Sequence, residues 1–133
     1  MKILLTILLL FVLVDALIVG YVIYRRWRKK ISPKRIEEIR RHWKEIIRNP
    51  DHRYAIMEAD KLLDLALGEI GYRGNLGAKL KKAPRLFSSL NDVWAAHKVR
   101  NNIAHQLHYK VDEGAYKKAM LAFKQAFQDL KIF

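Results

Sequence analysis

The chain has 133 residues, a net charge of +13 and no cysteine. That length leaves room for one small domain and excludes a multi-domain enzyme. The lack of cysteine excludes a disulfide scaffold, a zinc site with cysteine ligands, an iron–sulfur cluster and a cysteine nucleophile. A disordered basic tail is excluded as well, because 51% of the residues are hydrophobic and such tails are poor in apolar residues.

Residues 3–24 form an apolar stretch whose only charged side chain is Asp15. As a helix, this stretch is about 33 Å long, which is enough to cross the hydrocarbon core of a bilayer. We therefore expect residues 1–24 to be a transmembrane anchor. A cleavable signal peptide is the alternative. It is disfavoured because only Lys2 precedes the apolar run, which continues well past the poor cleavage sequence at residues 14–16.

Basic residues follow this stretch in a short linker, residues 25–32, whereas Lys2 alone precedes it. By the positive-inside rule, we expect the N-terminus outside and the C-terminal domain in the cytoplasm, as in a single-pass membrane protein. Residues 25–48 carry a net charge of +8 and residues 49–133 carry +5, so the net charge alone does not require nucleic acid. The cations expected to contact anionic lipid headgroups are Arg25, Arg26, Arg28, Lys29 and Lys30.

Asp15, inside the apolar stretch, has two interpretations. An acidic residue within a membrane span can be a proton site or a partner site. It can also be a protonated or helix-paired acid on a face where Ala16 and Gly20 allow another helix to approach closely. We favour the second interpretation, which points to self-association of the anchor.

Residues 33–133 are expected to form an all-α domain, an up-and-down four-helix bundle. Apolar residues recur there at helical spacing, and no segment shows the alternation that is typical of a strand. Ser and Asp residues stand where helix N-caps are expected, and the Asn-Pro pair at residues 49–50 separates the first two helices. The long helices are predicted to begin at Pro33, at Asp51, near Asn91 and at Asp112, with a short turn of helix at residues 78–82.

Several polar residues interrupt the apolar faces of these helices. Asp60 lies on the apolar side of the second helix, and His97, Arg100 and Asn101 take apolar positions on the third, with His105 on the same side. Because a buried unpaired charge is costly, these groups must pair with one another or face a shared cleft. The pattern leaves both interpretations open, an internal ion pair that fixes helix register or a functional cleft.

The six residues 100–105, RNNIAH, resemble the signature of the HEPN domain family. That signature is an Arg, a polar residue directly after it and a His after four to six intervening positions, near the end of a long helix. The resemblance covers about residues 33–131 and rests on this motif and the helical layout. It implies a homodimer whose two motifs face each other across a cleft. Many members are metal-independent endoribonucleases, and others are non-catalytic partners or nucleotide binders.

On this resemblance, Arg100, Asn101 and His105 are the predicted catalytic residues. Arg presents an always-charged fork to phosphate oxygens, His transfers protons near neutral pH, and Asn101 is expected to orient the His or a phosphate. One such His per chain is too few for separate acid and base roles, and a symmetric dimer would supply two. The burial pattern adds Asp60 and His97 as residues that orient Arg100 or His105.

The residues predict no cofactor and no metal. His105 and His108 have a spacing that could hold a metal ion, but no third ligand is evident nearby. A basic cluster at residues 79–85 is expected to be a solvated face, or an extension of an RNA groove. It comprises Lys79, Lys81, Lys82 and Arg85.

The leading prediction is a membrane-anchored HEPN-like endoribonuclease that acts on cytoplasmic RNA, or a toxin-type relative with an antitoxin or another protein partner. The alternative is a non-catalytic, membrane-tethered helical module that binds a protein or a nucleotide. A third interpretation is a simple lipid-surface protein, which would have no cleft in its soluble domain.

Overall fold

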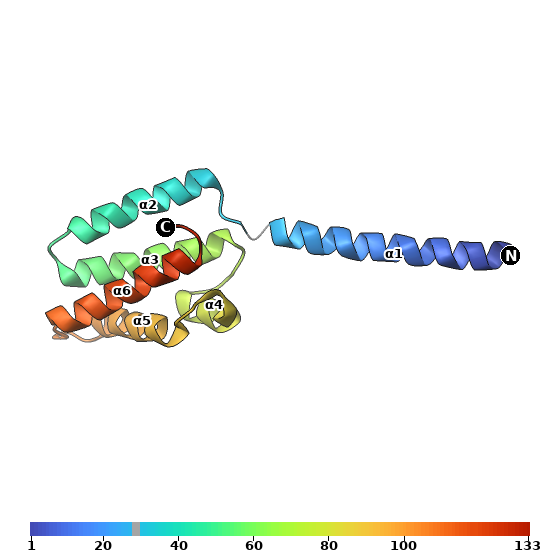
Figure 1. The fold of residues 1–133 in the computed structure, drawn as a ribbon. Coiled ribbons are helices and arrows are strands. Elements are labelled where there is room, and N and C mark those ends of the chain that lie inside the picture. The colour runs from blue at the N-terminus through green and yellow to red at the C-terminus, as the bar shows by residue number, and fades with distance from the viewer. Residues whose placement is uncertain (28–29) are drawn as a thin grey trace. The chain divides into compact units, whose positions relative to one another are not determined.

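The computed structural model describes residues 1–27 and 30–133, and for residues 26 and 27 the backbone alone. These residues divide into two units, Met1–Lys30 and Ile31–Phe133. Every regular element of the described residues is a helix, as Figure 1 shows. The prediction of an all-α protein with an apolar N-terminal helix is therefore confirmed.

The first unit is one long helix, α1 (Lys2–Trp27), which extends three residues beyond the predicted anchor. Its segment Lys2–Arg25 is long and apolar enough to cross a membrane, and none of that apolar window is buried against the rest of the protein. A signal sequence near an N-terminus passes the same test of length and composition. Of the five cations predicted to contact lipid headgroups, Arg28 and Lys29 lie outside the described residues, as does the side chain of Arg26.

The second unit begins with α2 (Pro33–Arg48) and α3 (His52–Glu69), which start where the sequence predicts. The Ser32 hydroxyl accepts a hydrogen bond from the N–H of Arg35 at 3.3 Å. The Asp51 carboxylate accepts hydrogen bonds from the N–H groups of Arg53 and Tyr54, at 2.9 and 3.2 Å. Both side chains satisfy N–H groups that have no partner in the first turn of a helix, which explains where the two helices begin.

The chain then turns at Gly71 and Gly74, whose φ angles of 99° and 104° are ones that glycine adopts without strain. Asn75 caps the next helix and Asp112 the last, through hydrogen bonds of 2.9 and 2.7 Å to backbone N–H groups. The elements after the turn are α4 (Leu76–Lys82), the 3₁₀ helix η1 (Pro84–Leu86), α5 (Leu90–His105) and α6 (Glu113–Asp129).

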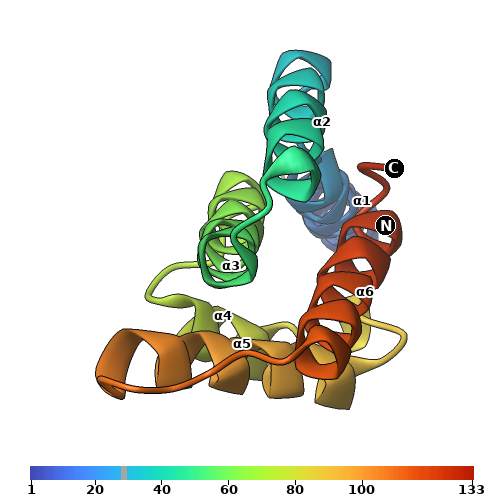
Figure 2. The same cartoon turned by 90° about the vertical axis from the view of Figure 1, so that its left-hand side faces the viewer.

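The core of the second unit lies between its four long helices. Trp43 of α2 meets the Phe127 ring edge-on, with ring centroids 5.3 Å apart, and Ile56, Leu63 and Phe123 are fully buried. In Figure 2, α2, α3 and α6 are seen nearly end-on, whereas α5 runs across the view beside α4. Of the long helices in this unit, α3 packs against each of the others and also against α4. Polar residues on α3 can therefore meet partners from both α4 and α5.

Candidate functional site

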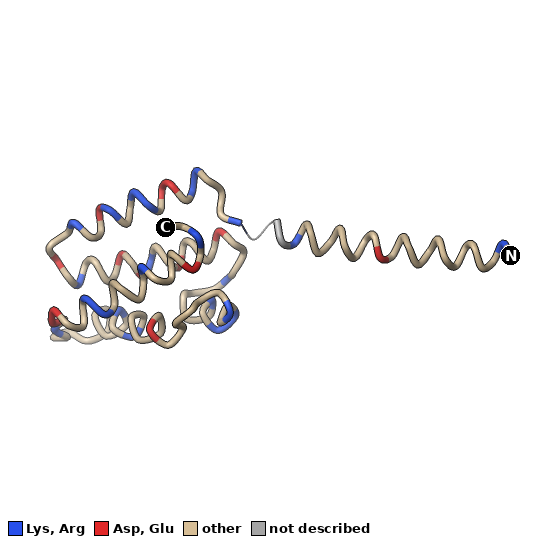
Figure 3. The backbone as a smooth tube through the Cα atoms, in the orientation of Figure 1, with Lys and Arg blue, Asp and Glu red and all other residues tan. Residues whose placement is uncertain are grey.

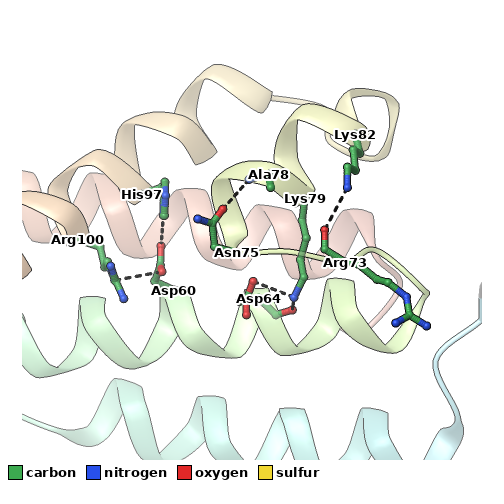
Figure 4. A network of polar contacts seen from close by, with 9 residues as sticks. All are labelled: Asp60, Asp64, Arg73, Asn75, Ala78, Lys79, Lys82, His97 and Arg100. Atoms are coloured by element: carbon green, nitrogen blue, oxygen red, sulfur yellow. Dashed lines mark hydrogen bonds and ion pairs between the residues drawn. The ribbon is translucent and has the colours of Figure 1, made fainter.

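Asp60 of α3 is the buried centre of a polar network, with only 3% of its surface exposed. Figure 4 shows its carboxylate pointing toward α5. One carboxylate oxygen, Oδ1, lies 2.7 Å from Nδ1 of His97. The other, Oδ2, lies 3.3 Å from Nε of Arg100. A buried carboxylate needs such partners, because an unpaired charge in this position would be strongly destabilising.

His97 and Arg100 reach the same carboxylate because residues three apart on a helix lie on one face. The His97 ring is held on further sides. The edge of the Trp94 ring faces it, with centroids 5.9 Å apart, and a Cβ placed at Gly77 would lie 3.6 Å from Nε2. Asp60, Trp94 and the backbone of α4 thus fix the orientation of His97, whose side chain is 13% exposed.

Arg100 uses two of its three nitrogens on its neighbours. Its Nη1 donates a hydrogen bond to Oδ1 of Asn101 at 3.0 Å. Its Nε faces Asp60 as an ion pair without hydrogen-bond geometry, and this nitrogen is itself buried. Within the described residues, Nη2 makes no hydrogen bond, and 27% of the side chain is exposed. The guanidinium is therefore held through Nε and Nη1, and Nη2 has no hydrogen-bond partner among the described residues.

Arg100 lines an open pocket of about 470 Å³ between α3, α4 and α5. His105 also lines this pocket and is exposed, at the last residue of α5. The structure thus brings all five sequence-predicted site residues to one place, although they come from two helices. The complete lining is Asp60, Lys61, Asp64, Asn75, Leu76, His97, Arg100, Asn101 and His105.

A second ion pair next to Asp60 was not predicted from the sequence. Asp64 lies one turn farther along α3, and its Oδ1 is 2.9 Å from Nζ of Lys79 on α4. The Lys79 ammonium also donates a hydrogen bond to the backbone carbonyl of Asp64 at 2.8 Å. The expectation that Lys79 belongs to a solvated basic face is wrong, because it is 7% exposed. Its place between the buried Leu76 and Leu80 was the signal that could have revealed this.

The pocket has the groups needed to bind a phosphodiester and to move a proton. Arg100 offers a charged donor for phosphate oxygens, and His105 is an accessible imidazole. Lys61 is also at the pocket, but its ammonium pairs with Glu58 at 2.6 Å. In the part of the chain that the structure describes, no group of three or more His, Asp or Glu side chains is arranged to hold a metal ion.

A larger groove of about 960 Å³ runs between α5 and α6 and contains none of the predicted site residues. Its lining includes small apolar side chains such as Ala95, Ala115 and Ala122. Two of its acidic residues have structural roles, since Asp112 caps α6 and Asp129 binds Ser88. We therefore place the candidate site at the pocket around Arg100.

A scan against protein-family models gave no match to this chain, and searches of curated proteins and of solved structures gave none either. The HEPN resemblance therefore rests on the residues 100–105, on the helical layout and on the position of the motif at the pocket. Function has to be argued from that pocket.

Proposed function

We propose that this chain is a membrane-anchored, HEPN-like endoribonuclease that cleaves cytoplasmic RNA without a metal ion. One observation carries the proposal: Arg100 and His105, the first and last residues of the motif, line the same solvent-open pocket. Asp60 lies 3.3 Å from Nε of Arg100, and the Arg100 side chain lines the pocket. A cation stabilises the charge that develops on a phosphate in the transition state, and an accessible imidazole can transfer a proton.

The reaction that suits these groups uses the 2′-hydroxyl of the RNA itself. Its oxygen attacks the adjacent phosphorus while a base takes the hydroxyl proton. The bond between phosphorus and the 5′-oxygen then breaks, and an acid gives that oxygen a proton. The products are a 2′,3′-cyclic phosphate and a 5′-hydroxyl. Arg100 stabilises the charge that grows on the phosphate oxygens, and His105 acts as base or as acid.

A homodimer is part of this proposal. Each pocket holds one accessible imidazole, His105, whereas His97 is engaged by Asp60 and largely buried. Two chains related by a two-fold axis would supply an acid and a base at one phosphate. An antitoxin or another protein partner belongs to the same HEPN resemblance and has no further support in the described residues.

We also propose that α1 anchors the enzyme in the membrane as a single span. The basic residues after the helix favour an orientation with the N-terminus outside and residues 33–133 in the cytoplasm. The pocket would then face the compartment that contains RNA.

The test is RNA cleavage by the purified full chain in detergent, with and without EDTA. We expect cleavage to survive EDTA and to be lost in His105→Ala. The matched control is His108→Ala, which removes an exposed imidazole three residues later, outside the pocket lining. Cleavage that persists in His105→Ala, or that EDTA abolishes, would contradict the proposal.

The alternative, a non-catalytic helical module, is favoured by one observation. Arg100 contacts Asp60 and Asn101, as it would in a purely structural cluster. Arg100→Ala should lower the melting temperature in either case, because it removes a partner of a buried carboxylate. His105 makes no hydrogen bond or ion pair in the described residues, so His105→Ala should leave the melting temperature unchanged. Loss of cleavage in that stable variant therefore separates the two functions, and a wild-type chain without cleavage favours the module.

A further inference from the structure

The outward face of α2 carries a row of cations. Ile39, Trp43 and Ile46 point into the core, with at most 7% of their surface exposed. On the opposite side, three exposed basic residues recur every seven residues, which is close to two helical turns, and a fourth, Lys44, lies between the last two. Figure 3 shows the Lys and Arg positions along this helix. The cations of this outward face are Lys34, Arg41, Lys44 and Arg48.

These four cations make no ion pair within the described residues. The other two cations of α2 are engaged: Arg35 pairs with Glu38 and Glu69 at 2.6 and 3.0 Å, and Arg40 donates to the carbonyl of Ile132 at 2.5 Å. Glu37 and Glu45 are also exposed on α2, so the outward face keeps an excess of two positive charges. It therefore presents an unpartnered basic surface to whatever lies beside it.

The length of the connection between α1 and α2 limits what can lie beside the outward face of α2. Five residues separate the end of α1 at Trp27 from the start of α2 at Pro33, and they span at most about 22 Å even when fully extended. Three of the five are Arg28, Lys29 and Lys30. The connection thus keeps the first residue of α2 within about 22 Å of the end of the proposed membrane span.

We propose that the outward face of α2 lies on the anionic phospholipid headgroups of the bilayer that α1 crosses. This inference rests on the proposed membrane anchor and is independent of RNA cleavage. The short connection keeps the face at a high effective concentration at the membrane. Attraction to the negative membrane surface acts over roughly 8 Å at physiological ionic strength. The cations of the face therefore contribute to membrane binding when the face lies directly on the headgroups.

Docking through α2 leaves the candidate site open. The pocket is lined by residues of α3, α4 and α5. In Figure 2, α5 lies on the far side of α3 from α2. A bilayer against the outward face of α2 would therefore not cover the pocket, and a large substrate could reach it from solution.

The absence of cysteine allows a direct test with single labels on the full chain. Lys44→Cys places a nitroxide label on the outward face of α2, and Lys124→Cys is the matched control, an exposed lysine on α6. The chain is incorporated into nanodiscs of neutral lipid or of neutral and anionic lipid. We expect a water-soluble relaxation agent to reach the Lys44 label severalfold less well in the anionic discs. The Lys124 label should be equally accessible in both.

A second variant checks that the charges are responsible. Lys34→Gln, Arg41→Gln and Arg48→Gln together change only exposed side chains, so folding should be kept and shielding of the Lys44 label lost. Salt at 1 M shortens the Debye length to about 3 Å and should also remove the shielding of the Lys44 label.

Equal accessibility of the Lys44 label in both kinds of disc would overturn the inference. Shielding of this label by added RNA in neutral discs would also overturn it, because the face would then bind RNA. A chain that does not enter discs at all would overturn the anchor and this inference together, whereas RNA cleavage in detergent would be unaffected.

Discussion

Asp60 is a single carboxylate that holds two side chains of α5, His97 and Arg100, against α3. The sequence revealed all three, because each places a polar group in an otherwise apolar helix face. It did not reveal which atoms meet. Lys79 was missed because its cationic neighbours at residues 81, 82 and 85 suggested a solvated face. The packing of α4 on α3 buries its ammonium against Asp64.

Replacing Asp60 by Asn should destabilise the domain, because the amide keeps the shape but removes the charge between His97 and Arg100. We expect the free energy of unfolding at pH 7 to fall by about 3 kcal/mol, the lower end of the range for a broken buried pair, since Arg100 is partly exposed. Urea denaturation measures this loss. Glu58→Gln breaks the more exposed pair with Lys61 on the same helix and should cost less than about 1 kcal/mol. Equal losses in the two variants would contradict a structural role for the Asp60 network.

At the scale of elements, helix starts were predictable where the cap is local. Ser32, Asp51 and Asp112 each bond an N–H group two or three residues farther along the chain. The start of α5 differs, because Ser89 makes no capping hydrogen bond with its side chain. Instead, Asp129 at the end of α6 accepts hydrogen bonds from the N–H and the hydroxyl of Ser88, at 2.8 and 3.0 Å. That contact joins residues 41 positions apart, so no pattern of neighbouring residues predicts it.

The Asp129 contact predicts a dependence of stability on pH. Burial raises the pKa of Asp129, but hydrogen bonds from Ser88 and Gln125 and the charge of Lys131 outweigh it, so the pKa lies below its ordinary value of 3.8. A lowered pKa means that the folded state binds the proton less readily than the unfolded chain. The stabilisation is therefore complete above about pH 4 and is lost as the pH falls through the folded-state pKa.

Asp129→Asn should accordingly reduce stability at pH 7, by less than about 1 kcal/mol because the group is partly solvated. The difference from wild type should shrink below about pH 4. Thermal melts from pH 7 to pH 2.5 measure it, with Glu37→Gln as an exposed control on α2. A difference that stays constant with pH would show that the charge of Asp129 is not involved.

At the scale of the whole molecule, the described chain has two units with separate physical characters. The side chains of residues 2–25 are all exposed, whereas the buried residues among the described side chains all lie at or beyond Ile31. The hydrophobic core is therefore built from residues of the second unit.

A chain of residues 31–133 should therefore fold without α1. We expect the helical circular dichroism signal and the melting temperature of the second unit to match those of the full chain in mild detergent. Cooperative thermal unfolding of the truncated chain is the measurement. A truncated chain that is unfolded, or that melts many degrees lower, would show that α1 supports the core.

Local patterns determined a large part of this protein: the apolar N-terminal helix, the all-helical class, the caps that start α2, α3 and α6, and the residues that break the apolar faces. These are effects of residues close together along the chain, where hydrogen bonding and helical periodicity act directly. Tertiary structure decided which partners the polar residues on the apolar faces have. It joined Asp60 to His97 and Arg100, buried Lys79 on Asp64, and left His105 exposed at the same pocket. Such contacts depend on how α3, α4 and α5 pack, and the side-chain volumes that set this packing come from all parts of the domain at once.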